Sequence, residues 1–504
     1  MRVGVLVTES TTRRGLLAAA AAAVGGLAGR AGAEPGVVRA DVDPGNVLFK
    51  LVQRVTFGSN DFEASNVRFL GFQAYLESQL NHTAINDSAV GALLAPLTNL
   101  TQLPWQLYTD NGFVNSTQVR YDLMHARVLR AFASRRQLFE RAVELWADHF
   151  NVDINAGVCV LFMVGFDRDV LRTRALGTFP QLLQAVAQSP AMLHYLNNDI
   201  SSLGQPNQNF ARELMELHTM GSQGGYTQAD VENVARCFTG WTIWPLNALP
   251  ENLRGSFQYR NDFHDQGVKT VLGQTIAAGG GLQDGLRVLE ILANHPSTAR
   301  HIATKIARFF LGDPVSTSVI DSIAATYTAT GGDIKAMIRT ALRPNVLASA
   351  PLKLKRPMHM FVSALRTVPT TISWSDGMRR ELNEAWNLPY SWGPPNGYPD
   401  TVDYWSGLMM PRWNFAFRVT SATGNFHSFL GDVAGVVIDD LPVFLNAATP
   451  DELTARIDRY VFSREMTPTD REVIRAYLAA VPSTRQRRRE ALGLAFALPS
   501  FQWY

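Results

Sequence analysis

Residues 207–220 read NQNFARELMELHTM, a spacing typical of an amphipathic α-helix. At 100° per residue, its polar side chains and the last methionine gather on one stripe: Asn209, Glu213, Glu216 and Met220, with Arg212 at the edge. The opposite side carries Ala211, Leu214 and His218. We therefore expect a helix over Asn207–Met220 that buries one side and presents two carboxylates on the other.

The same period of three and four residues recurs along most of the chain. Helix starts are supported by Thr227, three residues before Asp230 in a carboxylate variant of the capping box, and by Pro296 at a first-turn position. The pattern predicts a mainly α, multi-helical fold, with helices at residues 47–57, 69–80, 119–132, 138–150, 162–176, 179–186, 210–220, 231–238, 286–293, 299–311, 319–327, 334–342, 358–368, 453–461, 471–480 and 489–497.

One stretch departs from this period. Phe257 and Tyr259 alternate with polar residues, a turn-like segment follows, and residues 268–272 read VKTVL. This pattern predicts one small β-hairpin at about 254–272, between a helical lobe at about 40–245 and a second at about 284–504. Residues 388–404 hold too much proline and glycine for a helix interior.

The composition is that of a folded protein. Of 504 residues, 46% are hydrophobic and 18% charged, whereas disordered chains are rich in charge and poor in aromatic residues. Wholesale disorder is therefore excluded, and the chain is long enough to bury a large core.

The N-terminus indicates export. Arg13 and Arg14 precede an alanine-rich stretch, and Ala31-Gly32-Ala33 supplies a cleavage site before Glu34. Residues 1–33 are therefore interpreted as a twin-arginine-type signal peptide. The alternative is an uncleaved anchor, although the apolar run is shorter than the roughly 20 residues that a spanning helix needs. We expect a soluble mature protein in the periplasm, at the cell surface or outside the cell, with no membrane span after signal removal.

The charge balance argues against nucleic acid as a partner. The whole chain has a formal charge of +2. Removal of residues 1–33 takes away four arginines and one glutamate, which leaves a formal charge of −1. No basic footprint for a polyanion remains.

The carboxylates of Glu213 and Glu216 stand one helical turn apart. With Arg212 and Asn209 beside them, they are the candidate catalytic residues, either as an acid and a base or as ligands of a divalent metal. The alternative is a solvated stripe in which Arg212 and Glu216 form an i,i+4 ion pair.

Histidines supply the candidate metal ligands. His149 belongs to a helix whose polar face is Glu140, Arg141, Glu144 and Asp148, so His149 falls on the apolar face, and His218 does the same on its own helix. Such histidines are usually satisfied core residues. If both faced one core, they would form a metal or proton-transfer pair.

His264 and Asp265 lie in the predicted hairpin turn. The histidine is a further candidate ligand if it points into a cleft, and Asp265 is another unless its role is only to form the turn. Cys159 and Cys237 stand in apolar surroundings, and a disulfide between them is compatible with export.

Common cofactor and nucleophile motifs do not occur in the sequence. We find no Gly-x-Gly-x-x-Gly after a strand, Walker A loop, Gly-x-Ser-x-Gly, His-Glu-x-x-His or Cys-x-x-Cys. The sequence thus argues against dinucleotide, ATP, ordinary serine-hydrolase and c-type haem chemistry.

Several strings are distinctive: Asn207–Gly221, Gly224–Val231, Ala235-Arg236 with Thr239-Gly240-Trp241, Arg54–Gly58, His295-Pro296, and Arg412 with Asn414-Phe415-Ala416. Together they resemble the bacterial family catalogued as domain of unknown function 1800. The resemblance covers nearly the whole mature chain and implies export, a mainly helical fold and a single family domain over residues 34–504. It supplies no mechanism, because the family carries no settled activity.

Two positions depart from the family pattern. The family usually has Glu where Gln208 stands, and Ser-Pro-Glu-Phe-Gln where this chain ends Leu498-Pro499-Ser500-Phe501-Gln502. A carboxylate role at position 208 is thereby in question.

Two classes of function fit these observations. The first is an exported enzyme, dependent on a metal or another cofactor, centred on the Asn207–Met220 helix. The alternative is a non-catalytic envelope protein that assembles surface polymer together with another exported protein.

Overall fold

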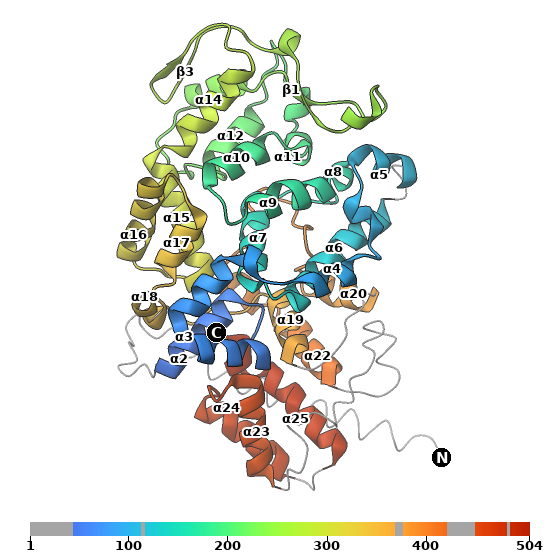
Figure 1. The fold of residues 1–504 in the computed structure, drawn as a ribbon, viewed down its shortest axis with the longest axis vertical. Helices are drawn as coiled ribbons and strands as arrows, with labels where there is room; N and C mark the ends of the chain where they lie inside the picture. The colour runs from blue at the N-terminus through green and yellow to red at the C-terminus, as the bar shows by residue number, and fades with distance from the viewer. Residues whose placement is uncertain (1–43, 112–115, 368–375, 421–448, 481–483) are drawn as a thin grey trace. The chain divides into compact units, whose positions relative to one another are not determined.

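The computed structural model describes residues 44–111, 116–367, 376–420, 449–480 and 484–504. The signal peptide expected at residues 1–33 lies outside them. Helices dominate the described residues, with two small two-stranded sheets, so the prediction of a mainly α, multi-helical protein is confirmed (Figure 1).

The chain forms two compact units, each assembled from separate segments. One contains the described residues up to Tyr75, those of Leu347–Leu388 and those of Thr401–Tyr504. Its helices are α2 (Pro44–Val55), α19 (Pro357–Thr367), α20 (Asp376–Glu384), α21 (Val402–Ser406), α22 (Met409–Thr420), α23 (Pro450–Phe462), α24 (Pro468–Ala479), α25 (Arg485–Ala497) and α26 (Pro499–Gln502). The organisation as one family domain over 34–504 stays a prediction.

The other unit contains Leu76–Val346 and Pro389–Asp400. Two helices, α3 (Asp61–Leu80) and α18 (Pro344–Ser349), contain the unit boundaries. Its own elements are α4 (Ser88–Leu94), α5 (Pro104–Asn111), α6 (Thr117–Ala133), α7 (Gln137–His149), α8 (Cys159–Gly165), η3 (Phe166–Leu171), α9 (Arg172–Arg174), α10 (Phe179–Ala187), α11 (Pro190–Tyr195), α12 (Gln208–Glu216), α13 (Gln228–Cys237), β1 (Trp241–Ile243), β2 (Phe257–Tyr259), β3 (Lys269–Val271), β4 (Gln274–Ile276), α14 (Leu282–Ala293), α15 (Pro296–Leu311), α16 (Thr317–Thr330) and α17 (Ile334–Ala341).

Local signals place the helix starts of this second unit. Thr227 caps α13, because its side chain accepts from the N–H of Asp230 while the Asp230 carboxylate accepts from the N–H of Thr227. Pro296 opens α15 at the expected first-turn position. Both sequence signals are confirmed.

The strands form, but they pair differently from the predicted hairpin. β2 is antiparallel to β1, with Tyr259 opposite Trp241, and β3 is antiparallel to β4. Leu272 and Gly273 join β3 to β4 with φ of 48° and 75°, as a tight two-residue turn requires. The predicted pairing of residues 257–259 with residues 268–272 was wrong. The alternation of apolar and polar residues over a strand of only three residues is too short to identify the partner strand.

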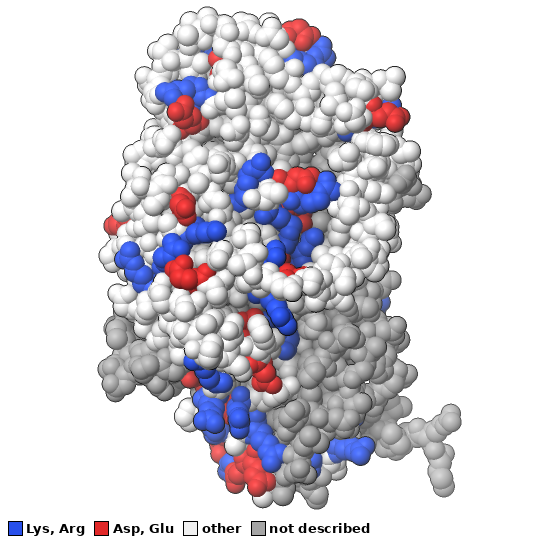
Figure 2. All heavy atoms as spheres, in the orientation of Figure 1, with Lys and Arg blue, Asp and Glu red and all other residues white. Residues whose placement is uncertain are grey.

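The polar face predicted for the 138–150 helix is largely buried. In α7, Glu140 and Arg141 are only 1% and 2% exposed. On the face shown in Figure 2, charged side chains gather in a hollow bordered by α6, α7 and α9. A helical face rich in charge is therefore inside the unit here, where its charges must be paired.

The proline-rich segment is irregular, as expected, and it is anchored to the second unit. The carbonyl of Tyr390 accepts from the N–H of Ile154 at 2.8 Å, and the Asn151 amide donates to the carbonyls of Trp392 and Pro394. The segment 389–400 is thus held by backbone contacts along its length. No helix in the described ranges is long and apolar enough to cross a membrane.

Candidate functional site

The helix α12 is fixed at its N-terminus by Asn207. The side-chain oxygen of Asn207 accepts from the N–H of Phe210 at 3.0 Å, and its amide donates to the carbonyls of Leu196 and Asn197. Ala211 and Leu214 are buried, as the sequence predicted. The cap and the apolar side together decide which way the carboxylates face.

The helix ends at Glu216, earlier than the expected Met220. The chain then turns, with the N–H of His218 bonded to the carbonyl of Glu213 and the N–H of Met220 to that of Met215. The Thr219 hydroxyl donates to the carbonyl of Leu214 and takes an acceptor that a continuing helix would use. Met220 is consequently buried and does not belong to the polar stripe.

Glu213 and Glu216 form a half-buried carboxylate pair. The Tyr226 hydroxyl donates to Glu216 at 3.2 Å. No described residue donates a hydrogen bond to the side-chain carboxylate of Glu213 or forms an ion pair with it. Burial, and then the negative charge of Glu216, raises the pKa of Glu213 against the opposing effect of Arg212. The two carboxylates therefore have different environments, although they lie one turn apart.

The ion pair expected between Arg212 and Glu216 as an alternative does not form. Arg212 donates to the side-chain carbonyl of Gln228 at 2.8 Å, and Gln228 in turn donates to Gln208 at 2.9 Å. The side chain of Asn209 is exposed and forms no hydrogen bond within the part of the chain that the structure describes. The stripe thus keeps its carboxylates apart from the neighbouring guanidinium.

Tyrosines flank the pair. Burial, and then Glu216, raises the pKa of Tyr226 to about 12. The pKa of Tyr195 is also raised, by burial first and then by negative charges that include Glu213. The Tyr195 hydroxyl donates to the carbonyl of Gly393 in the 389–400 segment. One neutral phenol, Tyr226, is therefore bonded to the pair, and no ammonium or guanidinium of a described residue is paired to it.

His149 and His218 do meet in one core. Their ring centroids are 6.2 Å apart, and Nε2 of His149 lies 3.0 Å from the carbonyl of His218. His301, which the sequence did not single out, is 6.1 Å from His149. Nδ1 of His149 and Nε2 of His218 are buried without a hydrogen-bond partner among the described residues. The proximity of His301 to His149 could not be predicted from the sequence. His301 belongs to α15, which is far along the chain from α7 and α12, and no local pattern links these helices.

The three imidazoles are neutral by virtue of their surroundings. Burial, with the positive charge of Lys305 next in size, lowers the pKa of His218 to about 3 and that of His301 to about 4, and places that of His149 well below 6.5. Within the described residues, no group of three or more His, Cys, Asp or Glu is placed to hold a metal ion. The three histidines therefore form a neutral cluster in the core, next to the C-terminal end of α12.

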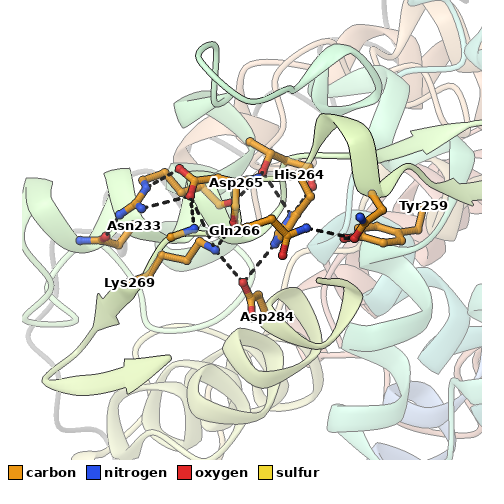
Figure 3. Close-up of polar contacts among 11 residues, drawn as sticks. Asn233, Tyr259, His264, Asp265, Gln266, Lys269 and Asp284 are labelled. Atoms are coloured by element: carbon orange, nitrogen blue, oxygen red, sulfur yellow. Dashed lines mark hydrogen bonds and ion pairs between the residues drawn. The ribbon is translucent and has the colours of Figure 1, made fainter. Parts of the chain in front are cut away.

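His264 and Asp265 belong to a different, fully bonded network (Figure 3). Nδ1 of His264 lies 2.7 Å from the carbonyl of Thr239, and Nε2 lies 3.0 Å from Oδ2 of Asp284. The same Asp284 oxygen accepts from Lys269 at 2.6 Å. Both ring nitrogens of His264 are occupied, so the expectation of a metal ligand pointing into a cleft is not met by this geometry.

Asp265 joins this network to α13. Its carboxylate accepts two bonds from Arg236, at 2.7 and 3.2 Å, and a third from the N–H of Gly267. The hydrogen bonds from Arg236 lower the pKa of Asp265, and this effect is larger than the opposing effect of burial. Asp265 therefore forms the turn, as its alternative role predicted, and also ties that turn to a helix.

The two cysteines are buried free thiols. Cys159 begins α8 and Cys237 ends α13, and burial raises the pKa of each to about 12. The disulfide that export would allow is not formed.

Comparison with known proteins places the chain in a family without an established activity. The model of a family described as "Protein of unknown function (DUF1800)" matches residues 50–503. No curated protein and no solved structure matches the chain. The match covers both compact units and includes α12, so it agrees with the resemblance noted in the sequence.

Proposed function

We propose, from the premise that this chain belongs to the DUF1800 family of proteins of unknown function, that it is an exported enzyme with an acid–base centre at Glu213 and Glu216. The observation that carries the proposal is a half-buried Glu213 carboxylate without a described partner, one turn from a second carboxylate held by Tyr226.

The two glutamates are suited to different roles. The raised pKa of Glu213 favours a carboxyl that keeps its proton closer to neutral pH, so Glu213 would donate the proton to substrate. Glu216 accepts a hydrogen bond from Tyr226 and would act as the second carboxyl group of the pair. A carboxyl group whose surroundings raise its pKa is typical of a general acid.

Arg212 and Asn209 would bind the substrate beside this pair. Arg212 donates from one nitrogen to Gln228, and its other guanidinium nitrogens form no hydrogen bond or ion pair with a described residue. Asn209 is exposed on the same stripe. A guanidinium and an amide suit a polar substrate with oxygen acceptors.

Export through the twin-arginine route is part of the proposal. It rests on the Arg13-Arg14 pair and the Ala31-Gly32-Ala33 site in the sequence. Replacement of Arg13 and Arg14 by lysine should leave the uncleaved precursor in the cytoplasm, as fractionation and mass determination would show. A mature protein beginning near Glu34 outside the cytoplasm in that variant would contradict the route.

Glu213→Gln and Glu216→Gln test the centre. The matched control is Glu290→Gln, which changes an exposed carboxylate of α14 that pairs with Arg287. We expect both site variants to fail to restore the phenotype of a deletion strain while they keep wild-type melting temperatures, and the control to restore it. Full restoration by both site variants would remove the enzyme proposal and favour the non-catalytic role in surface-polymer assembly with an exported partner.

The protonation of Glu213 can be followed directly. A water-soluble carbodiimide modifies protonated carboxyl groups, and mass spectrometry of peptides locates the product. Glu213 should react at a higher pH in the folded protein than in the denatured chain. Equal pH dependence of the two would contradict the acid role, and a stoichiometric divalent metal in elemental analysis of the exported protein would replace it with metal-bound chemistry.

A further inference from the structure

A cavity of about 680 Å³ lies in the unit that contains Leu76–Val346, apart from the residues of the proposed acid–base centre. One wall is the segment 83–94, which includes α4, and the other comes from α6, α7 and α9. It corresponds to the hollow in Figure 2 where charged side chains gather. Its volume falls within the range of small-molecule sites.

Arginines and carboxylates alternate in a series at the inner wall, of which Arg130, Glu140 and Arg172 line the cavity and Arg127 and Asp167 do not. Glu140 lies between Arg127, at 3.7 Å, and Arg172, to which it is directly bonded. Asp167 lies between Arg130, at 3.3 Å, and Arg172, at 4.0 Å. Two carboxylates thus hold three guanidinium groups. The cavity lining itself has three arginines, with Arg136 the third, against the carboxylates of Asp87 and Glu140, so positive charge is in excess by one.

Tyr390 closes the inner end of this series. Its hydroxyl donates to Asp167 at 2.7 Å, from the irregular 389–400 segment. Asp167 is buried, and the charges of Arg172 and Arg130 overcome the effect of burial and lower its pKa. Asp167 is therefore ionised, and its charge is already shared between two arginines.

Several guanidinium nitrogens have no acceptor. Nη1 of Arg172, on the cavity wall, is buried without a hydrogen-bond partner within the described ranges. The same holds for both terminal nitrogens of Arg127, which does not line the cavity, and for Oε2 of Glu140. Arg136, at the cavity wall, donates Nε and Nη2 only to the carbonyl of Ile85 and forms no ion pair with a described residue. Buried donors without acceptors cost free energy that an anion would recover.

The remaining walls can hold an organic body. The guanidinium carbon of Arg172 lies 5.1 Å from the centre of the Phe139 ring. The His82 ring stacks on the same Phe139 ring, with the two ring centres 4.4 Å apart. Val90 and Leu94 of α4 add apolar surface. The cavity therefore combines excess positive charge with an aromatic and aliphatic wall.

We propose that this cavity binds a small organic oxyanion, with its carboxylate or phosphate group on Arg130, Arg136 and Arg172 and its body against Phe139 and α4. Planar guanidinium groups recognise both kinds of oxyanion through paired N–H donors. The assignment is independent of the acid–base centre, because none of Asn209, Arg212, Glu213 or Glu216 lines the cavity.

Isothermal titration of the full mature chain with sodium citrate and with inorganic phosphate tests the site. We expect saturable binding of at least one probe with one site per chain. Binding of citrate alone assigns a carboxylate ligand, and binding of phosphate alone assigns a phosphate ligand. Absence of saturable binding of both probes would overturn the proposal.

Arg136→Gln should weaken the binding about tenfold, the effect of one charge-assisted hydrogen bond. Its matched control is Arg135→Gln, because Arg135 is the exposed neighbour that does not line the cavity. The control should bind within about twofold of wild type. Equal weakening in both variants would show attraction to diffuse surface charge and would overturn the site.

Gly91→Leu keeps every arginine and fills the cavity instead. Gly91 lines the cavity on α4, and a Cβ at this position meets no atom within 4 Å, so leucine should be accepted by the helix. The variant should fold and lose binding at least tenfold. Wild-type affinity in a folded Gly91→Leu protein would also overturn the site, whereas Glu213→Gln should leave the affinity unchanged whatever the outcome for the acid–base centre.

Discussion

The network around His264 and the arginine-lined cavity are both built from charged side chains withdrawn from water, and they differ in what is left over. His264, Lys269 and Asp284 are at most 2% exposed, and none has a buried side-chain atom without a hydrogen-bond partner among the described residues. At the cavity, the lining residues Glu140 and Arg172 both have such atoms, and so does Arg127, 3.7 Å from Glu140.

The difference separates structural polar groups from ligand-binding ones. A network that satisfies each of its donors and acceptors gains nothing from a ligand and serves to hold elements together. A network with surplus donors carries a cost that persists until a ligand arrives. The His264 network ties β3 and α14 to the end of α13, whereas the cavity and the α12 carboxylates remain open to partners.

The largest effect is expected where the network is closed. Asp284→Asn removes the negative charge that meets Lys269 at 2.6 Å and contacts His264. We expect a loss of about 3–5 kcal/mol in the free energy of unfolding, because a buried ammonium is left without its counter-charge. Denaturant unfolding measures it, with exposed Asp262→Asn as the control. A loss below about 1 kcal/mol would erase the contrast between the two regions.

The pH dependence of the free energy of unfolding tests whether the cluster of His149, His218 and His301 is neutral. His149 and His218 are buried, but each has a ring nitrogen without a hydrogen-bond partner among the described residues. His218 titrates near 6.5 when unfolded and at about 3 when folded, so protons bind the unfolded state first. Its contribution is complete above pH 6.5 and decreases as pH falls toward 3, by about 1.4 kcal/mol per pH unit. Between pH 5.5 and 4.5, where the unfolded imidazole is almost fully protonated, the unfolding free energy of His218→Phe should fall less steeply than that of wild type by close to this amount. Parallel pH dependence of the two proteins would contradict a neutral His218.

A smaller effect is expected at the edge of the His264 network. Arg236 and Asp265 are partly exposed, with side-chain exposures of 30% and 17%. Arg236→Gln should cost about 1 kcal/mol, because solvent screens the pair although the contact is bidentate. The control is Arg300→Gln, whose exposed pair with Asp321 should contribute close to nothing. Equal thermal stability of the two variants would mean that the network is no stronger at its edge than a surface pair.

The smallest effect has the opposite sign. The folded pKa of Glu213 is raised, so its ionised form destabilises the folded state once pH rises above the unfolded value near 4.5. At pH 7, Glu213→Gln should leave stability unchanged or raise it by less than about 0.5 kcal/mol, since the group is partly solvated. A clear loss of stability, as expected for Asp284→Asn, would place Glu213 among the structural carboxylates.

The sequence predicted the elements whose signals are local. The capping box of Thr227 and Asp230 and the first-turn Pro296 appear where they were expected. The helical wheel correctly assigned buried Ala211 and Leu214 to one side of α12 and Glu213 and Glu216 to the other, whereas His218 is buried as predicted but lies past the end of the helix. It failed only at Met220, because the Thr219 turn stops the helix one turn early.

What the sequence alone determined is therefore the helical character, the polar stripe of α12 and the candidate residues on it, since periodicity and caps depend on neighbours within about one turn. Only the tertiary structure decided which partners those residues have. It paired β2 with β1, brought His301 of α15 to His149, bonded His264 to Asp284, and turned the charged face of α7 toward arginines from α6 and α9. The physical reason is that the local sequence around a charged residue does not show whether its side chain is solvated or paired with a distant residue. Glu140, for example, is bonded to Arg172, which is 32 residues away in the chain. Burial and pairing are set by segments that meet only when the chain folds.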